Sequence, residues 1–144
     1  TMKFIAVVLI AILLSSAYSA QLLTKGSDLK KYLEGTKDGT FIILFFDREA
    51  PQLRTEDMRN QIRSKILKAN PAFNYFEVDI KEQEYNPIVD GMMKLDREEI
   101  KHSPTILVAS EGRGYWAHGE KAVDDVTFHL NEYSVDKVRE ARKQ

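Results

Sequence analysis

The sequence predicts an α/β protein built as a three-layer sandwich with a mixed central sheet. Two apolar segments, 40–46 and 73–80, stand on either side of an amphipathic helix, which is the pattern of a parallel βαβ unit. Two later segments, 103–109 and 114–118, are separated by a short glycine-bearing turn, so we expect them to pair antiparallel. Parallel and antiparallel pairs in one chain indicate a mixed sheet.

The first predicted helix covers 27–35, with the sequence SDLKKYLEG. Ser27 is a capping residue, Leu29 and Leu33 recur at helical spacing, and Gly35 ends the segment. The segment 40–46, TFIILFF, is then continuously apolar, β-branched or aromatic. Such a run is typical of a strand that is covered on both faces, and we expect it to be the central strand.

The predicted helix at 55–70 has apolar residues at every fourth position from Met58 to Ile66 and ends at Asn70, before Pro71. The strand at 73–80 follows, with alternate apolar residues from Phe76 to Ile80 on one face.

Asn86 and Pro87 then begin a further helix, in which Val89, Met92 and Met93 are expected to face the core. After the two antiparallel strands, apolar residues recur from Ala122 to Tyr133 along a last helix. The remaining residues, 135–144, form a charged C-terminal tail that we expect to fray.

The composition excludes several kinds of chemistry. The 144 residues include no cysteine, so thiol redox chemistry, disulfides and thiolate metal sites are impossible for this chain alone. The formal net charge is -1, without the basic excess that favours nucleic acid or acidic lipid. We find no Gly-rich phosphate loop, zinc-protease motif or nucleophile elbow, so we expect no cofactor and no metal.

The N-terminal residues have the layout of a secretory signal peptide: Lys3, an apolar run over 4–14, and the small-residue stretch SSAYSA before Gln21. We therefore expect residues 1–20 to be a signal peptide, 21–134 to be one domain, and the protein to reach the endoplasmic reticulum lumen or be secreted. The alternative is an uncleaved membrane anchor, since the apolar stretch continues through Ser and Ala to Leu23.

The order helix, strand, helix, strand, helix, proline, strand, strand, helix resembles the thioredoxin fold over most of the chain. Two features bear this resemblance: FIILFF followed by a turn and a long helix, and SPT at 103–105 directly before a strand, which looks like that family's cis-proline loop. The resemblance implies that Ala50 and Leu53 stand at the positions of the nucleophilic and resolving cysteines, and Leu44 at that of the buried carboxylate. The chain is thus similar to a redox-inactive, non-enzymatic member of the family.

Peptide binding could survive the loss of redox chemistry. In thioredoxin-like proteins, the backbone near the proline loop can pair with an extended peptide, so the resemblance implies a groove at Ala50, Leu53, Ser103 and Pro104 for a protein or peptide partner. The alternative for Pro104 is that it only shapes the entry to its strand.

Two other functions stay open. One is a membrane-anchored accessory subunit of a larger complex, if the N-terminal segment is retained. The other is acid/base or metal chemistry at His102 with Asp47 and Glu49, which requires these side chains to converge.

Overall fold

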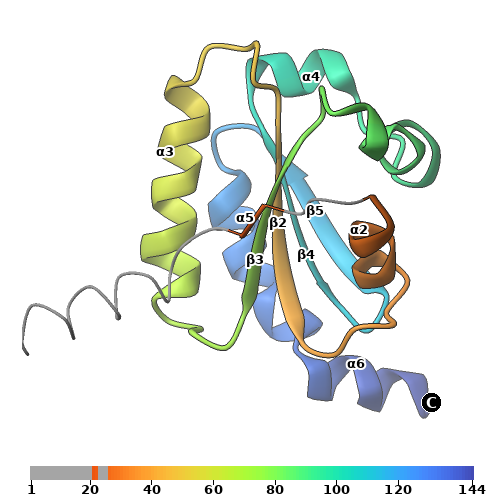
Figure 1. Cartoon of the computed structure of the whole chain (residues 1–144). Coiled ribbons are helices and arrows are strands. Elements are labelled where there is room, and N and C mark those ends of the chain that lie inside the picture. Colours follow the sequence, from red (N-terminus) through yellow and green to blue (C-terminus); the bar gives the residue numbers. More distant parts are fainter. Residues whose placement is uncertain (1–20, 23–25) are drawn as a thin grey trace, which may run out of the picture.

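The computed structural model describes residues 21–22 and 26–144, which form a mixed sheet between two layers of helices (Figure 1). The five strands lie in the order β1-β3-β2-β4-β5. β1 and β2 run parallel to β3, whereas β4 runs antiparallel to both β2 and β5. The strands are β1 (Gln21–Leu22), β2 (Thr40–Phe46), β3 (Asn74–Asp79), β4 (Thr105–Ser110) and β5 (Arg113–His118).

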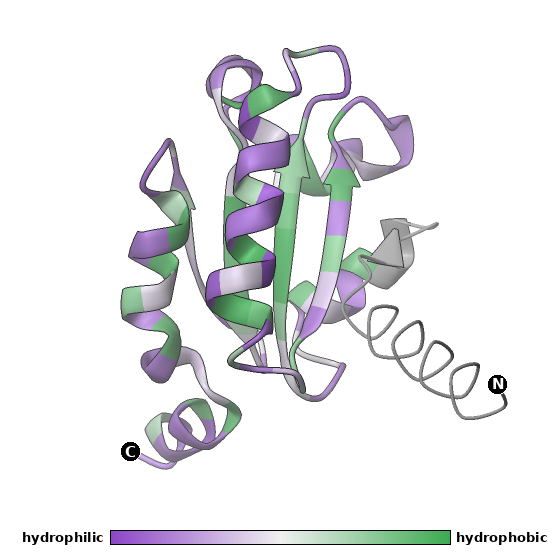
Figure 2. Cartoon of the chain, turned by 90° about the vertical axis from the view of Figure 1, so that its left-hand side faces the viewer, coloured by the Kyte–Doolittle hydropathy of each residue, from purple (hydrophilic) through white to green (hydrophobic). Residues whose placement is uncertain are grey.

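The helices cover both faces of the sheet. In Figure 1, α3 lies to the left of the strands and α2 to their right, and Figure 2 shows α3 in front of strands that are coloured mostly as hydrophobic. The layer of α2 contains α2 (Gly26–Leu33), η2 (Gln83–Tyr85), η3 (Pro87–Met92) and α4 (Arg97–His102). The layer of α3 contains α3 (Leu53–Gln61), the π-helical η1 (Ile62–Leu67), α5 (Ala122–His129) and η4 (Leu130–Tyr133).

β2 is the central strand, as the sequence predicts. Because side chains alternate along a strand, Phe41, Ile43 and Phe45 point into the core cluster beneath α2, and Ile42 and Leu44 point into the cluster beneath α3. All five side chains are completely buried. The continuous apolar run at 40–46 therefore results from burial on both faces.

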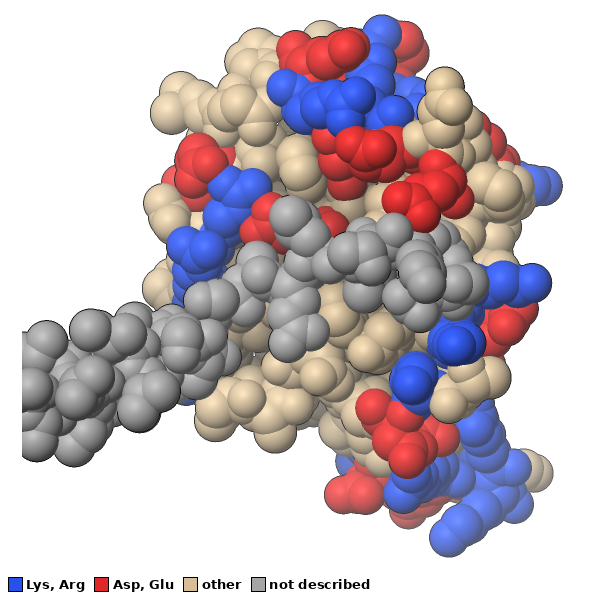
Figure 3. Space-filling model, viewed as in Figure 1, with Lys and Arg blue, Asp and Glu red and all other residues tan. Residues whose placement is uncertain are grey.

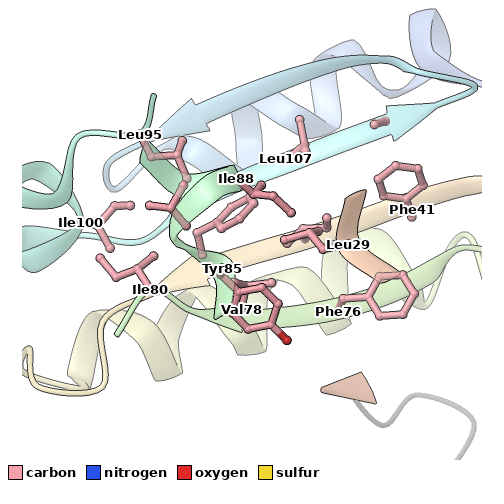
Figure 4. Close-up of a cluster of buried hydrophobic side chains, with 14 residues drawn as sticks. Leu29, Phe41, Phe76, Val78, Ile80, Tyr85, Ile88, Leu95, Ile100 and Leu107 are labelled. Carbon is pink, nitrogen blue, oxygen red and sulfur yellow. The ribbon is translucent and has the colours of Figure 1, made fainter. Parts of the chain in front are cut away.

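The predicted βαβ unit is also present, with β2 and β3 parallel and α3 and η1 between them. Met58, Ile62 and Ile66 are buried against the sheet, as their spacing predicts. On the opposite face, Phe76 and Val78 of β3 belong to the core cluster drawn in Figure 4.

Met92 does not face the core, contrary to the prediction, and is 47% exposed. Val89 is buried and Met93 packs partly against the same cluster. The backbone N–H of Met93 donates to the carbonyl of Ile88, five residues earlier, so η3 is a wide π-type turn. That wider turn rotates Met92 away from the face on which ordinary helical spacing would place it.

The prediction of a fraying tail at 135–144 is wrong for most of that segment, because it forms α6 (Val135–Arg142). Ser134 caps the helix by accepting a hydrogen bond from the N–H of Lys137, and Val138 is 2% exposed. Arg142 forms an ion pair with Glu111 in the β4–β5 turn, with Nη1 3.7 Å from Oε2. The buried Val138 and the ion pair with Glu111 thus hold this charged helix against the rest of the domain.

The predicted signal peptide, residues 1–20, lies outside the described residues. Within the part of the chain that is described, no helix has both the length and the apolar character needed to cross a bilayer.

Candidate functional site

A groove of about 700 Å³ lies where the parallel strands β2 and β3 end, next to the end of α4. The carboxyl ends of parallel strands are the usual place for sites in α/β folds, because the loops that follow them converge there. The residues that line the groove are Asp47, Glu49, Ala50, Pro51, Leu53, Arg54, Lys81, Lys101 and His102.

The loop from β2 to α3 is held in place by its own hydrogen bonds. The buried Asp47 side chain accepts a hydrogen bond from the Glu49 N–H through Oδ1 at 2.8 Å, and the backbone carbonyl of Asp47 accepts one from the Ala50 N–H at 3.1 Å. The Gln52 side-chain amide also donates to the Asp47 carbonyl, at 3.1 Å. This local network presents Leu53, the first residue of α3, with 83% of its surface exposed.

Ser103 and Pro104 are buried and do not line the groove, unlike Ala50 and Leu53. Ser103 instead lines a smaller pocket of about 210 Å³ beside α3. The described residues contain no cis peptide bond, so the Ser103–Pro104 bond is trans and the expectation of a cis proline is wrong. Ser103 is extended, with φ -159° and ψ 140°, and leads from α4 directly into β4. The trans form, which X-Pro bonds favour by about 0.5 to 1 kcal/mol, suits this straight entry.

The backbone near Ser103 is less available than the sequence suggested. The Ser103 N–H donates to the carbonyl of Glu99 at 3.0 Å, and the His102 carbonyl accepts from Arg54 Nη1 at 3.1 Å. The second bond joins the start of α3 to the end of α4, so the two predicted halves of the site do lie side by side. The accessible surface is provided by the β2–α3 loop rather than by the proline segment.

His102, Asp47 and Glu49 all line the groove, but the His102 ring makes no hydrogen bond to either carboxylate. Lys81 lies between the two acids, with Nζ 3.2 Å from Glu49 Oε2 and 3.8 Å from Asp47 Oδ2. An ammonium at that position opposes the binding of a divalent cation. Among the residues described, no three His, Cys, Asp or Glu side chains are grouped closely enough to hold a metal ion.

A buried carboxylate on β3 was not predicted from the sequence. Glu77 is 5% exposed and lies beside Leu44 in the parallel register of β2 and β3. Arg59 of α3 donates to it twice, from Nε to Oε2 at 2.8 Å and from Nη2 to Oε1 at 2.6 Å. The Tyr75 hydroxyl donates to Oε2 at 2.9 Å. The available signal was an acid between the apolar residues Phe76 and Val78 in the middle of the strand.

The surroundings of Glu77 shift the pKa values of its two partners. Burial, with a further contribution from the negative charge of Glu77, raises the pKa of Tyr75 well above its usual range. The hydrogen bonds from Arg59 to Glu77 raise the pKa of the guanidinium. Tyr75 therefore stays a neutral donor and Arg59 a cation, which leaves the Glu77 carboxylate fully engaged in hydrogen bonds.

The cations around the groove are paired. Lys101 Nζ is 2.6 Å from Glu98 Oε1, and Arg54 Nη2 is 3.7 Å from Glu120 Oε1. Figure 3 shows basic and acidic side chains intermixed at the top of the molecule, around the loops beside α4. The groove thus has charges of both signs at its rim and an apolar side formed by Ala50, Pro51 and Leu53.

No protein-family model matches the sequence, and no curated protein is recognisably similar to it. Solved structures are similar in three dimensions. Thioredoxin O2 from Arabidopsis thaliana superposes with a TM-score of 0.59 at 13% identity, covering 81% of this chain and 100% of the other. The chain has a thioredoxin-like fold.

Two further thioredoxins superpose in the same way. Mitochondrial thioredoxin 3 from Saccharomyces cerevisiae gives a TM-score of 0.58 at 14% identity, covering 81% of this chain and 98% of its own. Thioredoxin from Trypanosoma brucei brucei gives 0.55 at 15% identity, with 88% and 93% covered. At such identities the likeness defines the fold alone. This thioredoxin-like fold has Ala50 and Leu53 in its groove and no cysteine in its sequence.

Proposed function

We propose that the chain is a non-catalytic thioredoxin-like domain that binds an extended segment of another polypeptide in the groove. The main support is Leu53, a large apolar side chain that is 83% exposed at the wall of a groove, beside Ala50 and Pro51. Leu53, Ala50 and Pro51 together give the groove an apolar side, and ligand sites are typically concave and largely apolar.

The chemistry of the groove favours binding over catalysis. Thiol–disulfide exchange requires cysteine, and the sequence has none. An enzyme reaction at His102 with Asp47 and Glu49 has less support, because Lys81 lies between the two carboxylates. The domain accordingly acts by holding a partner, either transiently or as a component of an assembly, and needs no cofactor.

The arrangement of charge also indicates the type of segment that fits. Since Lys81, Lys101 and Arg54 each have an acidic neighbour, the groove offers little net charge to a ligand. An apolar side chain against Leu53, flanked by polar residues, is the complement that this surface favours.

The proposed location is the secretory pathway, supported by the pattern of residues 1–20. N-terminal sequencing of the natural protein tests it. A mature chain beginning near Gln21 supports secretion or residence in the endoplasmic reticulum, whereas retention of residues 4–23 supports a membrane-anchored accessory subunit.

The binding proposal can be tested by selecting peptides from a random display library on the purified protein and measuring their affinities in solution. We expect an apolar consensus, and a loss of about tenfold or more in affinity for Leu53→Asp, because a buried charge would replace the apolar contact. Phe128→Asp is the matched control, since Phe128 is 82% exposed on α5 and does not line the groove. Selected peptides that bind Leu53→Asp as well as the parent protein would refute the proposal.

A further inference from the structure

β5 forms one edge of the sheet, and no other strand in the described part of the chain pairs with its outer side (Figure 1). Natural edge strands usually avoid unwanted pairing through charged residues, proline or a bulge. β5 reads RGYWAH: it contains no proline, its only Lys, Arg, Asp or Glu is Arg113 at its first position, and its six residues pair one to one with β4 without a bulge. This edge is therefore open to another strand.

The register of the hairpin determines which backbone groups face outward. The turn residues Glu111 and Gly112 both have positive φ, 54° and 79°, as in a two-residue type I′ turn. In such a hairpin the flanking residues, Ser110 and Arg113, form a hydrogen-bonded pair, and hydrogen-bonded pairs recur at every second residue. Arg113, Tyr115 and Ala117 thus bond to β4.

The backbone N–H and C=O groups of Gly114, Trp116 and His118 then point away from the sheet. The surroundings of Gly114 support this register: a Cβ at Gly114 would lie 2.7 Å from the carbonyl oxygen of Val108, so that carbonyl points toward β5. Trp116 lies opposite Leu107 on the face of the sheet covered by α2, and it is 47% exposed.

We propose that β5 pairs antiparallel with β5 of a second copy of this chain, with Trp116 opposite its symmetry mate. In this register Gly114 of each copy lies opposite His118 of the other, so all three outward-facing residues are paired across a two-fold axis. Each of these pairs exchanges two backbone hydrogen bonds. Each tryptophan ring also lies diagonally next to Gly114 of the other copy, which has no side chain and leaves room for it.

Charge complementarity favours a second copy over an unrelated strand. Arg113 and Asp125 are both exposed, and neither belongs to an ion pair within residues 21–22 and 26–144. Arg113 projects from the same face of the sheet as Tyr115, because the two residues are two positions apart in β5. Asp125 is one turn before His129 on α5, and the His129 ring lies 4.3 Å from that of Tyr115. Asp125 is therefore on the flank of α5 that faces the free edge.

The two-fold axis brings these unpaired charges together. Arg113 of one copy lies opposite Gly119 of the other, three residues before the start of α5 at Ala122. It then approaches Asp125 in the first turn of that helix, and the symmetry produces the same pair twice. A single six-residue strand is a small interface, below the ~800 Å² per partner of a standard stable complex, so the dimer is concentration-dependent.

Sedimentation equilibrium of the full chain, expressed in a secretory host, over roughly 1 to 300 μM tests the proposal, because a weak dimer has a micromolar dissociation constant. We expect twice the monomer mass at the upper concentrations. We also expect the Trp116 amide to exchange with deuterium more slowly as concentration rises, because only pairing at the edge protects it. A monomer throughout the range, or exchange at Trp116 that does not depend on concentration, would overturn the proposal.

Substitutions separate this interface from other contacts. Trp116→Lys places two like charges opposite each other and should raise the dissociation constant about tenfold or more. Leu53→Lys is the control, because it replaces an exposed apolar side chain in the groove, outside the proposed interface, and should leave association unchanged. Equal effects of the two substitutions, or none from Trp116→Lys, would contradict the proposed interface.

A charge reversal at exposed positions tests the symmetry without risk to the fold. Arg113→Glu and Asp125→Arg should each weaken the dimer about threefold or more, by setting like charges together twice. The double variant should recover affinity to within about twofold of the parent, because it restores opposite charges across the axis. Failure of the double variant to recover would refute the pairing. The groove is not involved in this contact, so its peptide binding and the dimer can fail separately.

Discussion

We expect Arg59→Met to be among the most destabilising substitutions of a partly exposed side chain in this domain. The change removes the two hydrogen bonds from the guanidinium to Glu77 and leaves a carboxylate that is 5% exposed with Tyr75 as its remaining partner. A hydrogen bond to a charged group contributes about 1.5 to 3 kcal/mol, and breaking a buried ion pair costs about 3 to 5 kcal/mol. The free energy of unfolding should therefore fall by about 3 kcal/mol or more.

Urea unfolding followed by the fluorescence of Trp116, the single tryptophan, measures this loss. Arg48→Met is the matched control: Arg48 pairs with Asp79 and Glu82, but 52% of its side chain is exposed, so it should lose less than about 1 kcal/mol.

A double variant tests the mechanism. Arg59→Met with Glu77→Met removes both charges, so it should be more stable than Arg59→Met alone, because no unpaired carboxylate remains in the core. The reasoning would be refuted if Arg59→Met lost less than about 1 kcal/mol, or if the second substitution added to the loss.

Three other outcomes follow from the structure. The Arg97 hydrogen bonds lower the pKa of Asp90, so this carboxylate should contribute stability near neutral pH and lose that contribution as the pH falls through its lowered pKa. The unfolding midpoints of Asp90→Asn and the parent protein should therefore differ at pH 7, and the difference should shrink steadily as the solution is made more acidic than the ordinary carboxyl range. Val138→Ala should cost about 1 to 3 kcal/mol in urea unfolding, whereas Lys137→Ala on the same helix should be nearly neutral, and equal effects would show that α6 is not docked. Gly35→Ala should lower the free energy of unfolding by at least about 2 kcal/mol, since φ is 75° and a Cβ would lie 2.6 Å from backbone atoms of the β4–β5 turn. An unchanged melting temperature would contradict that close approach.

The fold could be predicted because its decisive signals are local. The apolar run of β2 and the four-residue spacing of Met58, Ile62 and Ile66 correspond to burial that the structure confirms. The exposure of Met92 and the docking of α6 could not be predicted from the sequence. The π-type turn before Met93 changes the direction of a side chain without a sequence signal, and docking of α6 depends on Glu111, which lies far earlier in the chain.

The location of the candidate site was likewise predictable, whereas the pairings within it were not. The β2–α3 loop and the end of α4 meet because the topology requires it, and the Arg54–His102 hydrogen bond joins them. The occupied N–H of Ser103 and the position of Lys81 between two acids depend on pairings between distant residues. Composition and spacing contain no information about such pairings, and the same is true of the Arg59–Glu77 contact.

The position of Lys81 means that the loop displaying Leu53 is sensitive to covalent change at a single amine. Acetylating Nζ would abolish its charge and leave Asp47 and Glu49 repelling each other across the base of the loop. The Asp47 carboxylate would then hold the Glu49 amide less firmly, which would be detected as faster deuterium uptake at Glu49 in the acetylated protein. A modifying enzyme could in this way loosen the groove by acting on Lys81 alone, one of the residues that line it.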